Sequence, residues 1–402
     1  MKNTILEYFL KYVKIDTMSM EDQNKVPSTD KQFNLAKVLV KDLEELGLED
    51  IKLTEHCFVT AVLKSNCNSN LHIGFVAHMD TIPGFSGTNV NPQIVNNYDG
   101  KVIKLKGIEL NPKQFPFLND LVGKTLITTD GTTVLGADDK AGVADIMAML
   151  NYYVNNPNQP HVNIHVAFTP DEEIGGGIDY MDVKGFGCDF AYTVDGLHYD
   201  EIEYENFNAS SALVEVSGLD IHPGSAKGQM KNAARIAMEF DSLLPEFERP
   251  EYTDGYEGFN HLCEISGEVG SAKLVYILRN HDKNKLLKQQ NDFMNTEAFL
   301  NNKYGKGTVK VTIKHSYSNM RELIEKDDRC VKRAEVAMRS LGIEPVSNPI
   351  RGGTDGAKLT LMGLNTPNIG TGGYNCHGPY EMACLEEMEL VVKTLIEIAK
   401  EQ

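Results

Sequence analysis

The sequence has no long uninterrupted run of apolar residues and no closely spaced pair of cysteines. A membrane-spanning helix needs about 18 or more consecutive apolar residues, so we expect no span. The first 16 residues, MKNTILEYFLKYVKID, lack the apolar region and cleavage site of a signal peptide. The seven cysteines are scattered and form no C-x-x-C pair, which argues against a disulfide framework and a structural zinc ribbon. We therefore expect a cytoplasmic protein.

Positive charge is also scarce. The chain has 39 Lys and Arg against 57 Asp and Glu, a formal net charge of −18. Such a surface repels phosphate backbones and anionic lipids, so we expect neither nucleic acid nor membrane partners. Common nucleotide and acyl-transfer motifs are missing too. A GKT occurs at residues 123–125, but Leu118 stands where the phosphate-binding loop needs its first glycine. There is no G-x-S-x-G, and the glycines at 175–177 lack the spacing of a dinucleotide fingerprint.

The first half of the chain alternates apolar strands with helices. The stretch VPSTDKQFNLAKVLVKDLEELG predicts a helix capped by Ser28 or Thr29 and ended by Gly47. Leu71–Ala77 is a nearly continuous apolar run typical of a buried strand, and residues 162–168 alternate as a strand should. This order predicts an α/β fold with a mixed, mostly parallel sheet flanked by helices.

A second domain is expected, because 402 residues exceed the size at which one hydrophobic core stops growing. Residues 208–318 read as β-α-β-β-α-β, the ferredoxin-like order. We interpret them as an inserted lid or dimerisation domain. Residues 1–207 and 319–402 would then form one discontinuous domain.

Acids and histidines follow the predicted strands where they end. They are His78 and Asp80, the pair Asp138-Asp139, the pair Glu172-Glu173, Asp195, and His377 in a late glycine-rich loop. In a parallel sheet such strand ends share one crevice. Crowded carboxylates repel one another unless cations are present. Two imidazoles with three carboxylates suit zinc, or manganese or cobalt, and a shared carboxylate would hold two ions about 3.5–4 Å apart.

Each motif alone has an ordinary explanation. A lone H-x-D is uninformative, and a D-E-E run is usually a solvated turn. The repetition of the same feature at four strand ends favours a site. Asp80 can accept the second imidazole N–H of His78, because residues two apart on an extended segment point the same way. Glu172 and Glu173 would face opposite directions, one toward metal and the other toward substrate.

At these residues the sequence resembles a known family. The series GFVAHMDTIP, LITTDG, LGADDKAG, AFTPDEEIG, AYTVDG, HPGSAKG, IRGGTDGAKL and TGGYNCHG is similar to the peptidase T group of tripeptide aminopeptidases. That group belongs to the two-zinc exopeptidases that include carboxypeptidase G and succinyl-diaminopimelate desuccinylase. The similarity spans essentially the whole chain.

The resemblance implies a role for each residue. His78 and Asp195 would complete one metal site, Glu173 and His377 the other, and Asp138 would bridge them, with a cis peptide after it. Asp80 would orient His78, and Glu172 would be the general base. His222 would supply a donor to the oxyanion, and Arg279 and Arg351 are candidates for gripping the peptide.

Function also follows from the resemblance. It implies hydrolysis of short peptides, releasing the N-terminal residue of tripeptides with two divalent ions, zinc first and manganese or cobalt as alternatives. It also allows a homodimer through the exposed sheet edge of the inserted domain. Alternatives on the same scaffold are a deacylase or desuccinylase of N-acyl amino acids, a dipeptidase, and a non-catalytic peptide-binding protein.

Overall fold

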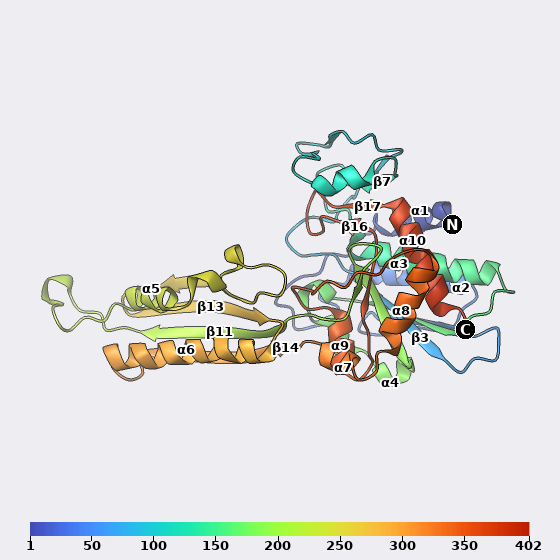
Figure 1. Cartoon of the computed structure of the whole chain (residues 1–402). Coiled ribbons are helices and arrows are strands. Elements are labelled where there is room, and N and C mark those ends of the chain that lie inside the picture. Colours follow the sequence, from blue (N-terminus) through green and yellow to red (C-terminus); the bar gives the residue numbers. More distant parts are fainter. Residues whose placement is uncertain (402) are drawn as a thin grey trace. The chain divides into compact units, whose positions relative to one another are not determined.

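A computed structural model describes residues 1–401 of the chain and divides it into two units (Figure 1). Unit 1 comprises Met1–Tyr204, Met320–Asn348 and Thr354–Gln402. Unit 2 comprises Glu205–Asn319 and the short return segment Pro349–Gly353. Among the described residues, no helix is both long and apolar enough to cross a membrane.

A seven-stranded sheet in the order β1-β2-β8-β3-β9-β15-β10 forms the centre of unit 1. Its four central strands are parallel: β8 (Asn163–Thr169), β3 (His72–His78), β9 (Phe190–Gly196) and β15 (Asn368–Gly370). Its outer strands are antiparallel to their neighbours: β1 (Glu49–Leu53), β2 (Val59–Leu63) and β10 (Ile202–Glu203). The prediction of a mixed sheet with a parallel core is confirmed.

Helices cover both faces of this sheet. On one side α3 (Ala137–Asn155) lies against β3 and β9 and packs with α1 (Lys2–Tyr12) and α10 (Leu385–Ala399). The other side carries the 3-10 helix η3 (Gly177–Tyr180), α4 (Val183–Phe186) and α9 (Asp355–Leu361), which bury Ile178, Phe186 and Leu359 against strand residues such as Val76. The remaining helices are α2 (Gln32–Glu45), α7 (Arg321–Ile324) and α8 (Arg329–Ser340). Because helices cover both faces of the sheet, the carboxyl ends of its strands are where a binding site can form.

The start of α2 differs from the prediction. The helix begins at Gln32, its N-cap is Lys31, and no side chain caps it. Ser28, expected as a cap, instead donates its hydroxyl to Asp171, far along the chain. Its predicted end is correct: Gly47 follows the helix in the left-handed region, with φ of 75°.

The irregular stretch after β3 forms a small layer of short elements. A four-stranded sheet in the order β16-β17-β7-β4 joins β4 (Gln93–Val95) and β7 (Leu126–Thr128) to β16 (Gly373–Tyr374) and β17 (Met382–Cys384). A two-stranded ribbon pairs β5 (Ile103–Lys104) with β6 (Glu109–Leu110), and the 3-10 helix η1 spans Pro116–Leu121. This layer has its own apolar cluster, which includes Tyr98, Leu118 and Tyr374.

Unit 2 is a four-stranded antiparallel sheet in the order β12-β13-β11-β14 with two helices on one face (Figure 1). Its elements are β11 (Asn208–Ser217), α5 (Ala233–Leu243), β12 (Phe259–Gly267), β13 (Ser271–Asn280), α6 (Lys283–Tyr304) and β14 (Val309–Tyr317). Alternate residues of β11 and β13, such as Val214 and Leu274, bury against Phe240 of α5 and Phe293 of α6. Residues 208–318 therefore have the expected β-α-β-β-α-β order.

Candidate metal centre

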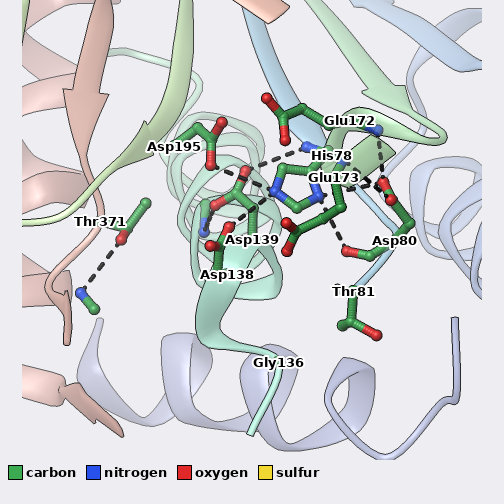
Figure 2. Close-up of polar contacts among 12 residues, drawn as sticks. His78, Asp80, Thr81, Gly136, Asp138, Asp139, Glu172, Glu173, Asp195 and Thr371 are labelled. Atoms are coloured by element: carbon green, nitrogen blue, oxygen red, sulfur yellow. Dashed lines mark hydrogen bonds and ion pairs between the residues drawn. The ribbon is translucent and has the colours of Figure 1, made fainter. Parts of the chain in front are cut away.

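The predicted ligands come from five different segments of unit 1. His78 is the last residue of β3, Asp195 lies near the end of β9, and Asp138 lies at the start of α3. Glu173 follows β8, and His377 lies in the loop between β16 and β17. Figure 2 shows His78, Asp138, Glu173 and Asp195 turned toward one another.

Asp138 lies between the two histidines. One of its carboxylate oxygens is 2.9 Å from His78 Nε2, and the other is 3.0 Å from His377 Nε2. His78 Nε2 is also 3.5 Å from Asp195 Oδ1, and His377 Nε2 is 3.2 Å from Glu173 Oε2. The structure therefore brings all five predicted ligands together, with one carboxylate touching both halves of the group.

Glu172 and Glu173 do not lie in an extended segment, as the sequence suggested. They form the first turn of the 3-10 helix η2 (Glu172–Ile174), directly after Asp171, which has a left-handed φ of 57°. Glu172 groups with His78 and Asp195, whereas Glu173 groups with His78 and Asp138, each set having ligand atoms within 4.8 Å. The two glutamates therefore lie in different halves of the site. They diverge because they belong to a helical turn, and not because they alternate along an extended segment.

Asp80 contacts both His78 and the turn formed by Glu172 and Glu173, here called the glutamate turn. His78 Nδ1 lies 3.0 Å from the backbone oxygen of Asp80 and 3.4 Å from its carboxylate. The same carboxylate accepts the backbone N–H groups of Glu172 and Glu173 at 3.0 and 3.3 Å. Asp80 therefore holds the imidazole largely through its main chain and the turn through its side chain.

The peptide bond between Asp138 and Asp139 is cis, as the resemblance implied. Asp139 is fully buried and accepts the backbone N–H groups of His78 and Gly142, at 3.2 and 3.1 Å. Both of its oxygens are thus engaged by the scaffold. Of the two adjacent aspartates, Asp138 is the one between the histidines.

Two buried acids at this site were not found from the sequence. Glu381, which is 1% exposed, accepts three backbone N–H groups, from Leu135, Gly136 and Asp138, at 2.7–3.0 Å. Asp355, at the start of α9, accepts the hydroxyl of Thr169 at 2.9 Å. Neither follows a predicted strand, so the strand-end pattern could not reveal them. Asp355 stands within the motif IRGGTDGAKL, whereas Glu381 lies three residues beyond TGGYNCHG and carried no signal.

The crowded acids of the site have pKa values shifted from their usual range. Burial, reinforced by the charge of Asp195, raises the pKa of Glu172 well above its usual value. Burial raises the pKa of Glu173 to about 7 although His377 opposes the shift. Asp138 is the exception, because hydrogen bonds from His377 and His78 outweigh burial and lower its pKa. A site that holds this much negative charge is suited to cations.

The predicted substrate-binding residues all lie in unit 2. His222 is exposed, and its Nδ1 accepts the N–H of Gly224 at 3.2 Å. Arg279 lies over the ring of Tyr317, 5.2 Å from its centroid. Arg351 donates to the carbonyls of Gly255 and Glu257 at 2.7 and 2.8 Å, so its guanidinium is engaged within its own unit. The roles of the three residues stay predictions.

Comparison with known proteins is consistent with this geometry. The sequence profile of the peptidase family M20/M25/M40 matches residues 135–401. The chain belongs to this peptidase family. It is therefore an enzyme that hydrolyses peptides.

Members of the family are similar along their whole length. Peptidase T of Clostridium perfringens is 52% identical over 396 residues, which cover 98% of each chain. The crystal structure of aminopeptidase PepT from Bacillus cereus superposes with a TM-score of 0.79 at 20% identity, covering 99% of this chain and 98% of that one. A tripeptidase from Staphylococcus aureus gives a TM-score of 0.80 at 22% identity, covering 100% and 98%. At these identities the two structures show the shared fold.

Proposed function

We propose that this chain is a two-metal aminopeptidase that releases the N-terminal residue of tripeptides. The observation that carries the proposal is the carboxylate of Asp138, which lies within 3.0 Å of both His78 and His377. The names of relatives support the substrate class, since a protein 52% identical over nearly the full length is called peptidase T. The structural relative from Staphylococcus aureus is called a tripeptidase.

The residues present fit a pair of divalent cations. His78 and Asp195 would hold one ion, Glu173 and His377 the other, and Asp138 would contact both. Glu173 Oε1 is buried and has no hydrogen-bond partner, so it is available to a metal ion. Two nitrogen and three carboxylate ligands suit zinc, with manganese or cobalt as alternatives. Bound there, the ions would supply Lewis-acid polarisation of the scissile carbonyl and acidify a nucleophilic water.

The protein itself supplies orientation and proton transfer. Glu172 lies beside His78 and Asp195 but outside the pair of ligand sets proposed above, so it is free to act as general base. It would accept a proton from the attacking water and return it to the leaving amine. Asp80 would keep His78 and the glutamate turn in register.

The base assignment is tested with Glu172→Ala. We expect both metal ions to remain, measured by elemental analysis, while kcat for a tripeptide falls by about 10²–10⁴-fold, the usual range for a positioned base. Glu344→Ala is the matched control, because Glu344 is an acid whose side chain is 80% exposed. Turnover near the wild-type value in Glu172→Ala contradicts the assignment.

Substrate class is tested with a panel of tripeptides, dipeptides, N-acetylated amino acids and N-succinylated amino acids. Each substrate is assayed with chelator, without it, and after adding back zinc, manganese or cobalt. We expect tripeptides with a free N-terminus to be cleaved best, and chelation to abolish their cleavage. Preference for blocked amino acids would replace the aminopeptidase by a deacylase, and preference for dipeptides by a dipeptidase.

The proposal extends to the cellular location and the oligomeric state of the protein. All seven cysteines are free, which suits a reducing cytoplasm where such an enzyme would degrade peptides. Strand β12 lies at the edge of the unit 2 sheet, and an edge strand can pair with a second chain. We therefore propose a homodimer through unit 2, and light scattering of the purified chain tests whether a dimer forms.

A further inference from the structure

Residues 15–32 are here called the brace. This N-terminal segment contacts three stretches of chain that carry residues of the proposed metal centre. The N–H and the hydroxyl of Ser19 both donate to the backbone oxygen of Thr81, the residue after Asp80, at 3.0 and 3.1 Å. Lys140, two residues after Asp138 and 1% exposed, donates its ammonium to the backbone oxygen of Ile15 at 2.8 Å. Both contacts lie within unit 1.

The third contact is the most elaborate. Asp171 directly precedes Glu172, is fully buried, and receives three hydrogen bonds from the brace. Ser28 donates its backbone N–H at 2.6 Å and its hydroxyl at 2.5 Å, and Gln32 Nε2 donates at 2.6 Å. Hydrogen bonds to a carboxylate are roughly twice as strong as neutral ones. This link joins positions 143 residues apart in the sequence.

Asp171 adopts a conformation that needs such support. Its φ of 57° is left-handed, a conformation that costs a non-glycine residue free energy unless its surroundings enforce it. Its backbone oxygen also accepts the N–H of Gly176 at 3.0 Å, so the chain from 171 to 176 turns back on itself. The direction in which η2 leaves β8 therefore depends on how Asp171 is held.

The glutamate turn is fixed from both ends by buried carboxylates. Asp80 accepts the backbone N–H groups of Glu172 and Glu173, while the brace holds Asp171. If Asp171 rotates, the backbone of Glu172 must move with it, and Glu173 follows. A misplacement of about 1 Å in a catalytic group can cost 10²-fold in rate.

We propose that the brace is a positioning element of the metal centre, in which Ser28 and Gln32 act through Asp171 to aim Glu172 and Glu173. This inference rests on the proposed function, because it assigns the two glutamates to the base and to a metal ligand. The competing explanation is that the three hydrogen bonds only attach the N-terminal segment to the fold. The two explanations differ in what changes when the bonds are removed.

The experiment uses the full chain with Ser28→Ala and Gln32→Leu, singly and combined, and titrates each metal-free protein with Co²⁺ alone by visible absorption. Ser28→Ala keeps the backbone N–H bond to Asp171, so it serves where the double variant fails to fold. The matched control is Tyr12→Phe. Tyr12 likewise donates a hydroxyl to a buried carboxylate, Asp42, at 2.8 Å, but Asp42 is not part of the metal centre.

We expect the double variant to raise at least one of the two Co²⁺ dissociation constants about tenfold and to alter the absorption spectrum of the bound ions. With saturating metal, kcat for a tripeptide should fall about tenfold while KM stays within twofold. Tyr12→Phe should lower the thermal midpoint without changing either quantity. Variants that lose only thermal stability, with wild-type Co²⁺ binding and kcat, overturn the inference.

The Co²⁺ titration also separates this inference from the proposed function. A wild-type chain that binds no Co²⁺ overturns the metal centre and the brace together. A wild-type chain that binds two Co²⁺ ions but cleaves no tripeptide overturns the substrate assignment alone, and the brace is then decided by the dissociation constants and spectra of the variants.

Discussion

Glu381 illustrates how a buried side chain can act on a site without belonging to it. Its two oxygens accept the N–H groups of Leu135, Gly136 and Asp138, the last of which is the residue proposed to bridge the two ions. Burial raises its pKa to about 7, so the carboxylate is costly to keep charged and needs all three donors. The backbone of Asp138 is fixed by this side chain.

Replacing Glu381 by Gln should loosen that arrangement. An amide nitrogen cannot accept a hydrogen bond, so at least one buried N–H loses its partner, at about 1–3 kcal/mol of unfolding free energy. We expect Co²⁺ affinity to fall about tenfold as well, because Asp138 is displaced. Titration and chemical unfolding measure the two effects, with the exposed Glu344→Gln as control. Unchanged affinity in Glu381→Gln would show that the three bonds do not position Asp138.

His165 gives a prediction about pH. Its Nε2 lies 2.8 Å from His72 Nδ1, and burial together with the His72 charge lowers its pKa to about 4. In the unfolded chain a histidine has a pKa near 6.5. As pH falls below about 6.5 the unfolded chain therefore takes up the proton first, and the folded state loses stability until about pH 4.

The loss between pH 6.5 and 5 should be about 2 kcal/mol, from 1.36 kcal/mol per pKa unit. His165→Gln lacks this titration. Between pH 7 and 5 the unfolding free energy of the wild type should therefore fall by about 2 kcal/mol more than that of the variant. Titratable groups that do not contact His165 are common to the two proteins and cancel. A difference that is the same at both pH values would refute the assignment.

The strand-end pattern predicted the residues that follow buried strands of the central sheet, and it missed two buried acids that do not. His78 and Asp195 could be found because a buried strand precedes each, and strand ends meet at one edge. Glu381 and Asp355 follow no such run, and only the folded chain brings them to the site. The sequence predicts Ser28 or Thr29 as a helix cap, since a hydroxyl before a helix usually acts as one, but Ser28 binds Asp171 instead. Its partner Asp171 is too distant in sequence to be inferred.

At the scale of elements, the loop that carries His377 is held by aromatic rings from η1 and the residue before it. Phe117 stacks on Tyr374 with ring centroids 4.7 Å apart, and Phe115 contacts Tyr380 at 5.2 Å. Tyr374 and Tyr380 stand on either side of His377. Tyr374 also donates its hydroxyl to Glu387 at 2.6 Å, which ties the loop to α10.

Phe117→Ala should therefore weaken metal binding more than catalysis. Without the stacked ring the loop gains freedom, and ordering it again upon binding lowers the affinity of the ion held by His377. We expect a rise of about tenfold in one Co²⁺ dissociation constant, with kcat at saturating metal within about threefold of wild type. The control is Phe247→Ala, which removes a ring that is 71% exposed in unit 2. Equal effects of the two variants would contradict the inference that Phe117 holds the loop that carries His377.

Most of the layer that supplies these rings has no strand or helix pattern in the sequence. Its strands span two or three residues, for example Ile103–Lys104, too short for a period of two to appear. The long strands and helices that bury their faces against the central sheet were predicted, because burial imposes a repeating apolar pattern on them. Pairing of short segments depends on partners such as β17, more than 200 residues away.

At the scale of the whole chain, the proposed ligands belong to one unit only. All five lie in unit 1, whereas unit 2 has a hydrophobic core of its own around Phe240, Tyr276 and Phe293. A ligand that binds only the folded state stabilises the unit that binds it, by about 4 kcal/mol at a thousand times its dissociation constant. A protein of two units need not unfold in one step, so such an effect can remain local.

Chelation should accordingly destabilise unit 1 and spare unit 2. Without cations, the carboxylates of Asp138, Glu173 and Asp195 are left close together, and their repulsion opposes folding of the segments that carry them. We expect hydrogen exchange after chelation to accelerate in peptides from α3 and β9 and to stay constant in peptides from α5 and α6. Adding back zinc, manganese or cobalt should restore the original rates. Equal acceleration in both units would mean that the metal ions stabilise the chain as one cooperative body, and no acceleration in either unit would mean that the five residues hold no ion.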